Sequence, residues 1–392
     1  MIVLSANRLY TPQEEIKDPL LFIEEGLISA VSSRAEREVP KNATVIDLAK
    51  DGLAEAILVP GFVDIHMHGG AGVDLMRAAP SELPRLNKFL TTHGVTGYFP
   101  TTVAAPLDQT CSALARLADA IEAAPGSHAG GDVIGARPLG IHLEGPFLSH
   151  KRRGVHPPEY LVEPTLGVFE RLWQAARGHV RMMTIAPELS GAPEVIAEAA
   201  RRKVCVSIGH SDATLEAARA GVCAGARHAT HTFNAMRPLD HRDPGILGEV
   251  LTDPRLSGDI IADGIHVAPE VIQIFLRSVG FERSVLITDA MAAAGMPDGT
   301  YQLGPIQVEV KDGKCTSNGS LAGSVLTMDR AVRNITRFSD WTLREAVRAA
   351  TLNATRAVGL AQHGELAPGA EANIIVMSPE GEVQRTIVRG HC

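Results

Sequence analysis

Residues 141–147 read IHLEGPF: a short apolar strand runs into a single carboxylate, Glu144, and Gly145 and Pro146 then stop the strand. A carboxylate at the mouth of a buried strand is unfavourable unless a cation or hydrogen-bond donors compensate its charge. Taken alone, Glu144 could simply be a hydrated residue that opens a loop. Several other apolar runs also end at His or Asp, and this wider pattern favours a metal ion as the partner of Glu144.

Short apolar runs recur through the middle of the chain, and helical stretches separate most of them. The expected strands are 58–65, 94–100, 138–143, 180–185, 204–208, 226–230, 258–262 and 285–287, and the expected helices are 81–92, 107–124, 166–177, 192–202, 213–220 and 269–279. Strands that are buried on both faces read as continuous apolar runs, as these do. Eight such units in about 250 residues are the pattern of an α/β fold of the (β/α)8 TIM-barrel type.

The two ends of the chain have a different pattern, in which short apolar segments alternate with turn residues and lack a helical period. These segments lie at 1–6, 20–24, 27–31, 44–48, 372–377 and 383–388. We expect residues 1–57 and 362–392 to form one small β-sandwich domain, and residues 58–361 to form the barrel domain between them. A hairpin is expected within 301–317, and helices at 328–338 and 343–358.

The composition argues against several kinds of partner. Hydrophobic residues make up 45% and charged residues 21% of the 392 residues, with a net charge of −8 and no basic cluster, so we expect no nucleic-acid partner. No apolar run approaches the roughly 20 residues that cross a bilayer, and no secretion signal is evident. The five cysteines are scattered without CxxC spacing, which is typical of reduced thiols. We therefore expect a cytoplasmic protein without a membrane partner.

Side chains that bind metals follow the predicted strands at the points where the strands end. In chain order they are His66, His68, Glu144, His210, His231, Asp263, His266 and Asp289. In a barrel these strand ends converge on the face where active sites lie. Any one of these imidazoles could be an ordinary hydrogen-bonded core histidine, but core packing does not explain the whole set.

The spacing of these residues suggests how they would bind metal. His66 and His68 are one residue apart on an extended segment, so both side chains face the same way and can hold one ion. Glu144, His210 and His231 supply three nitrogen and oxygen ligands and leave a position open for water, as in catalytic zinc sites.

Asp289, in the segment LITDAM, supplies the remaining chemistry. A carboxylate beside metal-activated water can accept its proton and later deliver that proton to a leaving group. These groups suit hydrolysis of an amide or an ester. The glycines of this chain never form a phosphate-binding loop with its lysine, so a nucleotide site is not expected.

At this point the motifs resemble those of a known family. The HxH pair on the first barrel strand and the Asp after the eighth are similar to the amidohydrolase superfamily. Within it, the chain resembles the N-acetylglucosamine-6-phosphate deacetylases over nearly its whole length, through HLEGPF (142–147), GHSDAT (209–214), HATHTFNAM (228–236), DGIH (263–266) and SLAGS (320–324). Glu144 stands where many relatives carry a carboxylated Lys, and TIAPE (184–188) has no Lys either. Both features disfavour a dihydroorotase-like or urease-like protein.

The resemblance implies a role for each matched position. The principal metal would be held by Glu144, His210 and His231, and a second ion by His66, His68, Glu144 and Asp289. Asp289 would be the catalytic acid and base. The substrate-binding residues would be His156, Asn234, Ala235, Arg242, His266, Leu321, Ala322 and Gly323. Enzymes of this family are homodimers, in which the arginine can reach the sugar phosphate of the partner subunit.

The resemblance implies hydrolysis of the acetamido group of N-acetyl-D-glucosamine 6-phosphate to glucosamine 6-phosphate and acetate. Two alternatives stay open: a deacetylase for the galactosamine epimer or another N-acyl compound, and a barrel that has lost catalysis and serves in binding or assembly. The ligands suit Zn²⁺, and also Fe²⁺, Co²⁺ or Mn²⁺, with one or two ions per subunit.

Overall fold

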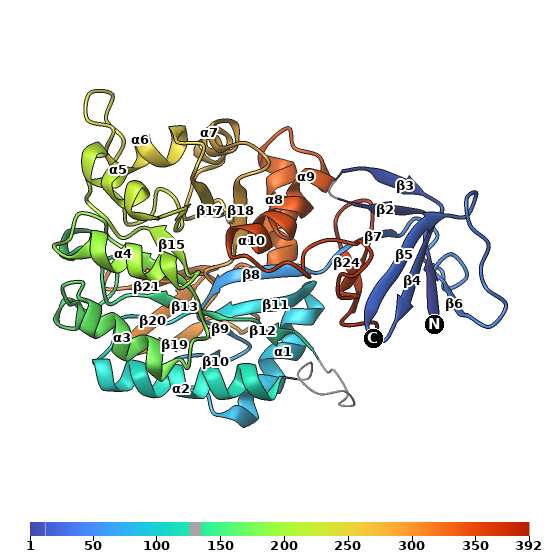
Figure 1. The fold of residues 1–392 in the computed structure, drawn as a ribbon, viewed down its shortest axis with the longest axis horizontal. Helices are drawn as coiled ribbons and strands as arrows, with labels where there is room; N and C mark the ends of the chain where they lie inside the picture. The colour runs from blue at the N-terminus through green and yellow to red at the C-terminus, as the bar shows by residue number, and fades with distance from the viewer. Residues whose placement is uncertain (12, 125–134, 392) are drawn as a thin grey trace.

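The structure is a computed structural model that describes residues 1–11, 13–124 and 135–391. Within these residues, eight parallel strands form a TIM-type barrel, so the predicted fold class is confirmed (Figure 1). In chain order the strands are β8 (Phe62–Met67), β11 (Val95–Pro100), β13 (Ile141–Glu144), β14 (Val180–Ile185), β15 (Cys205–Ile208), β16 (His228–Ala229), β17 (Ser257–Ile261) and β18 (Ser284–Ile287).

Two hydrogen-bonded sheets close into the barrel. One has the order β12-β11-β8, where β12 is Arg137–Pro138, and the other runs from β13 to β18 in chain order. A parallel bridge between Thr101 and His142 joins them on one side. On the other side the backbone N–H of Asp289 donates to the carbonyl of His66 at 3.0 Å. The predicted run 138–143 is therefore split, because residues 137–138 pair with β11 and residues 141–144 pair with β14.

Helices surround the barrel, and most begin within two residues of the predicted positions. They are α1 (Leu83–Thr92), α2 (Leu107–Ala123), α3 (Leu166–Ala175), α4 (Ala192–Arg201), α5 (Leu215–Ala224), α6 (Gly245–Thr252), α7 (Pro269–Val279), α8 (Met328–Phe338), α9 (Leu343–Ala349) and α10 (Leu352–Ala357). The single helix expected at 343–358 is two helices, because the chain leaves the helical conformation at Thr351. Among the described residues, no helix combines the length and apolarity that a membrane span requires.

The segments from the two ends of the chain form two packed sheets beside the barrel, at the right of Figure 1. One sheet has the order β5-β4-β1-β6, with β1 (Ile2–Ser5), β4 (Pro19–Glu24), β5 (Leu27–Ser33) and β6 (Thr44–Asp47). The other has the order β24-β23-β7-β2-β3, with β2 (Arg8–Tyr10), β3 (Glu15–Lys17), β7 (Ile57–Pro60), β23 (Ile374–Met377) and β24 (Val383–Ile387). Leu4, Leu21, Leu58 and Ile374 pack between the sheets. The chain thus carries the small β-sandwich that its pattern predicted.

One expected strand was wrong in its extent. The run 58–65 was predicted as a single barrel strand, but residues 57–60 pair with β2 and β23 of the terminal sheet, and the barrel strand begins at Phe62. Gly61 lies between the two strands, where a Cβ atom would come within 2.3 Å of Thr96 Oγ1. Glycine therefore lets the chain change sheets without a steric clash. The exact domain boundaries stay a prediction.

An antiparallel sheet follows the barrel and extends the expected hairpin to four strands: β19 (Gly299–Leu303), β20 (Ile306–Lys311), β21 (Lys314–Ser317) and β22 (Ser320–Leu321). Leu303, Val308 and Cys315 pack against Val103 and Met291, which follow β11 and β18. The added sheet therefore lies against the carboxyl ends of the barrel strands.

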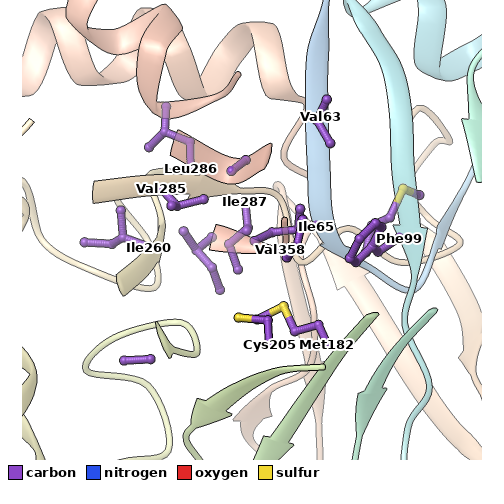
Figure 2. Close-up of a cluster of buried hydrophobic side chains, with 14 of the residues drawn as sticks. Val63, Ile65, Phe99, Met182, Cys205, Ile260, Val285, Leu286, Ile287 and Val358 are labelled. Carbon is purple, nitrogen blue, oxygen red and sulfur yellow. The ribbon is translucent and has the colours of Figure 1, made fainter. Parts of the chain in front are cut away.

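The apolar core lies between the strands and the surrounding helices, and Figure 2 shows part of it, with Val63, Ile65, Phe99, Met182 and Val285 among the labelled side chains. In β8, Val63 and Ile65 alternate with Asp64 and His66. Because successive side chains of a strand point to opposite faces, Asp64 and His66 face the barrel interior. Four cysteines, Cys111, Cys205, Cys223 and Cys315, are free thiols, and Cys392 lies outside the described residues.

Candidate active site

The candidate metal ligands come together at the carboxyl ends of the barrel strands, as expected for this fold. His66 lies near the end of β8 and Glu144 is the last residue of β13. His210, His231 and Asp289 each follow a strand by two residues. All six residues, including His68, are at most 8% exposed.

Glu144, His210 and His231 form the first group of ligands. The Oε1 atom of Glu144 lies 3.2 Å from His210 Nε2 and 3.0 Å from His231 Nε2, and the two Nε2 atoms are 3.1 Å apart. Three donor atoms from β13, β15 and β16 therefore point at one small volume. These three residues are the ones expected to hold the principal metal, and that role stays a prediction.

His66, His68 and Asp289 form the second group. Asp289 Oδ1 lies 3.1 Å from His68 Nε2 and 3.6 Å from His66 Nε2. Glu144 also reaches this group, because its Oε2 atom is 3.3 Å from His68 Nε2 and its Oε1 atom is 3.5 Å from His66 Nε2. Glu144 therefore lies between the two groups, as a bridging ligand would.

The residues of both groups fit a divalent cation. Within each group the donor atoms lie within 4.8 Å of one another, and every donor is an imidazole nitrogen or a carboxylate oxygen. Both ring nitrogens of His66 are buried without a hydrogen-bond partner, and so is His231 Nδ1. Buried polar atoms are rarely left unpaired in proteins. Nitrogen and oxygen donors in such a cluster suit Zn²⁺ and related transition metals.

The charges in the site also call for a cation. Burial lowers the pKa of His68, but hydrogen bonds and charge from Asp289 and Glu144 outweigh burial and raise it to about 10. Burial also lowers the pKa of His231, but the hydrogen bond and charge of Glu144 outweigh burial and raise it to about 9. Burial raises the pKa of Asp289, but His66 and His68 lower it to about 2. Burial raises the pKa of Glu144, but the charge of His66 and hydrogen bonds from other imidazoles hold it well below its ordinary value. Both carboxylates are thus ionised and attract positive charge.

Further contacts fix the orientation of three rings. His68 Nδ1 lies 3.2 Å from the carbonyl of Thr101, and His210 Nδ1 lies 2.9 Å from the carbonyl of Arg152. A carbonyl only accepts, so both rings carry a proton on Nδ1 and turn Nε2 toward the site. His156 is the opposite case, because its Nδ1 accepts the N–H of Ala104 at 3.1 Å. Its Nε2 therefore donates, and it lies 3.7 Å from Glu144.

A cavity of about 310 Å³ opens onto both groups of ligands. Of the eight predicted substrate-binding residues, six line it: His156, Asn234, Ala235, His266, Leu321 and Gly323. Ala322 is fully buried among apolar side chains instead. Arg242 does not line the cavity of its own chain; it lies in an exposed segment, where its backbone N–H donates to Asp240 at 2.9 Å.

The structure shows the partners of three further acidic residues, of which the sequence singled out only Asp263, as a side chain at a strand end. Asp263 accepts the Nδ1 proton of His266 at 2.7 Å and the backbone N–H groups of Ile265 and His266 at 2.7 and 2.8 Å. Asp64 and Asp259 lie deeper in the barrel and are fully buried. The spacing of Asp263 and His266 in DGIH is the one signal that could have revealed such a pair.

Comparison with known proteins extends these observations. A model of the amidohydrolase family matches residues 57–392. The chain is 38% identical to the N-acetylgalactosamine-6-phosphate deacetylase of Escherichia coli O157:H7, over 99% of this chain and 98% of that protein. It is 36% identical to the N-acetylglucosamine-6-phosphate deacetylase of Vibrio furnissii, over 98% of this chain and 93% of that protein. It also superimposes with a TM-score of 0.90, at 36% identity, on a mutant of the Mycobacterium smegmatis N-acetyl-D-glucosamine-6-phosphate deacetylase in complex with N-acetyl-D-glucosamine-6-phosphate, covering 100% of this chain and 98% of that one.

Proposed function

Because this chain belongs to the amidohydrolase family, we propose that it is a hydrolase that removes the acetyl group from N-acetyl-D-glucosamine 6-phosphate. The products would be D-glucosamine 6-phosphate and acetate, in amino-sugar catabolism or cell-wall recycling. One observation carries the proposal: the buried carboxylate of Glu144 has five imidazole nitrogens within 3.0 to 3.7 Å. Relatives that are 34–38% identical over at least 98% of this chain, and are named as deacetylases of such sugars, support the substrate class.

We assign the principal ion to Glu144, His210 and His231, and a second ion to His66, His68 and Asp289, with Glu144 between them. We propose Zn²⁺, since imidazole and carboxylate donors suit it, although the same donors bind Fe²⁺, Co²⁺ and Mn²⁺. A bound divalent cation would lower the pKa of water and polarise the acetyl carbonyl.

The side chains of this chain would handle the protons. Asp289 is ionised and lines the cavity, and its Oδ1 atom lies 3.1 Å from His68 Nε2. It would accept the proton of the attacking water and then deliver it to the amine nitrogen as the C–N bond breaks. His156, which carries its proton on Nε2, would donate a hydrogen bond to the acetyl group or to the sugar.

The other end of the cavity would bind the sugar phosphate. His266 and Asn234, which line the cavity, would bind the phosphate there, and Leu321 and Gly323 would line the sugar site. Among the described residues that line this cavity there is no Lys or Arg, so a phosphate dianion lacks a strong cation within one chain. We therefore propose a homodimer in which Arg242 of one subunit completes the phosphate site of its partner. We also propose a cytoplasmic location, because a phosphorylated sugar is an anion that the cell membrane retains.

A deacetylase for N-acetylgalactosamine 6-phosphate is the second candidate. It is favoured by the 38% identity to the E. coli O157:H7 enzyme of that name, which matches this chain from end to end. The two epimers differ only in the orientation of one hydroxyl group. Both candidates use the same proposed ligands and the same proton carrier, so kinetics must separate them.

The test is an acetate-release assay on both epimers, each with and without phosphate, together with elemental analysis of the purified protein. We expect a transition metal in the protein and the highest kcat/KM on the glucosamine 6-phosphate derivative. A higher kcat/KM on the galactosamine derivative would select the second candidate. Absence of acetate release from all four compounds by metal-loaded protein would contradict both.

A further inference from the structure

Two buried carboxylates lie in the barrel interior below the candidate site, and neither has a part in the reaction described above. Asp64 is in β8 and Asp259 is in β17, and both are fully buried. Bulky apolar side chains usually fill the interior of such a barrel. A buried charge is unfavourable unless strong hydrogen bonds compensate it. The partners of these two carboxylates therefore indicate why they are there.

Asp259 holds the backbone of a proposed metal ligand. Its Oδ1 atom accepts the backbone N–H of His231, and its Oδ2 atom lies 2.9 Å from His228 Nε2. His231 has a left-handed backbone, with φ of 29°, a conformation that residues other than glycine rarely adopt. The Nδ1 atom of His231 has no hydrogen-bond partner. No hydrogen bond from Nδ1 therefore fixes the ring, and the bond to Asp259 holds the backbone from which the ring projects.

Asp64 does the same for the other group of ligands. Its Oδ1 atom accepts the backbone N–H groups of His66 and Thr288, each at 3.3 Å, and its Oδ2 atom accepts the hydroxyl of Thr288 at 2.5 Å. Thr288 precedes Asp289, so one carboxylate fixes two neighbouring ligand segments, from β8 and β18. Neither ring nitrogen of His66 has a hydrogen-bond partner.

The remaining imidazole ligands are held in another way. His68 and His210 donate through Nδ1 to the carbonyls of Thr101 and Arg152. Each group of ligands thus contains one ring that a carbonyl orients and one ring without such support. In both groups, the unsupported ring belongs to the residue whose backbone N–H donates to a buried carboxylate.

We propose that Asp64 and Asp259 are positioning residues, one for each group of metal ligands. Asp259 would set the metal affinity of the group Glu144, His210 and His231, and Asp64 that of the group His66, His68 and Asp289. The inference rests on the two metal sites of the proposed function, but not on the substrate. Its test measures metal binding alone, so a protein that binds metal as expected and lacks deacetylase activity leaves it intact.

The experiment is a titration of the metal-free protein with Zn²⁺, followed by calorimetry. His210→Ala and His68→Ala each remove one ligand and so identify which binding event belongs to which group. Asp259→Asn keeps an oxygen that can accept the N–H of His231 but removes the charge, and hydrogen bonds to charged groups are about twice as strong as neutral ones. It should therefore weaken the His210 event by about tenfold, the lower end of the effect of outer hydrogen-bond partners on metal affinity, and leave the His68 event within about twofold. Asp64→Asn should do the reverse. If the wild type binds one ion, only the Asp→Asn variant that belongs to the occupied group should lower the affinity for that ion.

Two further variants guard against a trivial result. Thr288→Val removes the 2.5 Å bond to Asp64 with little change in shape. It should weaken metal binding at the same group as Asp64→Asn, and it replaces that variant in the test if Asp64→Asn does not fold. Ser257→Ala is the matched control, because it removes the 2.6 Å contact of His228 Nδ1 but leaves in place the hydrogen bond that the His231 N–H donates to Asp259. It should bind Zn²⁺ like the wild type. General loss of stability would weaken both events alike, and that outcome, or unchanged affinity in Asp64→Asn and Asp259→Asn, would overturn the proposal.

Discussion

Replacement of Asp263 by Asn tests how the proposed phosphate site is built. Asp263 follows β17, and its side chain is only 5% exposed. It accepts three hydrogen bonds of 2.7 to 2.8 Å, two from backbone N–H groups and one from His266 Nδ1. Burial raises the pKa of Asp263, but the hydrogen bond and charge of His266 lower it below its ordinary value. The carboxylate is therefore ionised and fixes the ring of His266, which lines the cavity.

The magnitude follows from the bonds that the substitution breaks. Asn keeps one acceptor oxygen and replaces the other by an NH₂ group, which cannot accept the proton of His266 Nδ1. One hydrogen bond to a charged group contributes about 1.5–3 kcal/mol, and each 1.4 kcal/mol is about tenfold in affinity. We expect KM for the phosphorylated sugar to rise at least about tenfold. The value of kcat should change by less than about threefold, because Asp263 touches no reacting atom.

Steady-state acetate release on the phosphorylated and unphosphorylated sugars measures this effect. Asp263→Asn and His266→Ala should each raise KM for the phosphorylated sugar, and the double variant should be no worse than His266→Ala. Asp119→Asn, which alters an exposed carboxylate of α2 that pairs with Arg177 at 2.6 Å, is the control and should match the wild type. An equal loss on both sugars, or a loss in kcat alone, would refute the assignment.

The remaining predictions concern the proton carrier, the partner subunit, the metal and the stability of the fold. Asp289→Asn should lower kcat by about 10²–10⁴, the usual contribution of a general acid or base; near-normal turnover would exclude the assigned role. Arg242→Ala should raise KM for phosphorylated substrates with little change in kcat, and mixing it with an Asp289→Asn protein should restore some sites in hybrid dimers only if the arginine acts across the interface. Chelation should lower the unfolding temperature and Zn²⁺ should restore it. The metal would add up to about 4 kcal/mol to the free energy of unfolding when it is at 1,000 times its Kd. Burial raises the pKa of Asp329, but His93 and Arg333 among its neighbours lower it to about 2, below its unfolded value. The stabilisation that ionised Asp329 gives the folded state is therefore complete at neutral pH and is lost as the pH falls toward 2. Asp329→Asn should cost about 2 kcal/mol at pH 7 and about half as much at pH 3, as measured by urea unfolding.

The barrel could be predicted because its strands are buried on both faces and read as continuous apolar runs. The same reasoning missed α6 (Gly245–Thr252), whose first seven residues are all buried. Such a helix has no polar face, so the periodicity that marks an amphipathic helix is absent. The sequence also could not show that the run 58–65 divides into two strands, because an apolar run does not reveal which sheet each half will join.

The candidate ligands could be predicted from residue type and from their position after the strands. The buried carboxylates that hold the backbone of these ligands could not be predicted. Asp259 meets His231 across 28 positions of the chain, and Asp64 meets Thr288 across 224. Each contact joins a carboxylate to a backbone N–H, and every residue except proline offers that group. No pattern of side chains in the sequence therefore marks the partner.

The backbone at the strand ends explains how the barrel presents its ligands. His210, His231 and Asp289 each lie two residues past a strand, and each has a left-handed φ, of 47°, 29° and 50°. This conformation is unfavourable by about 1–2 kcal/mol for residues other than glycine. In each residue the carbonyl accepts a backbone N–H at 2.8 to 2.9 Å, so hydrogen bonds hold the turn that aims the side chain. The folded chain thus sets the directions of these candidate ligands, and substitutions that release these turns should weaken metal binding even though every ligand remains.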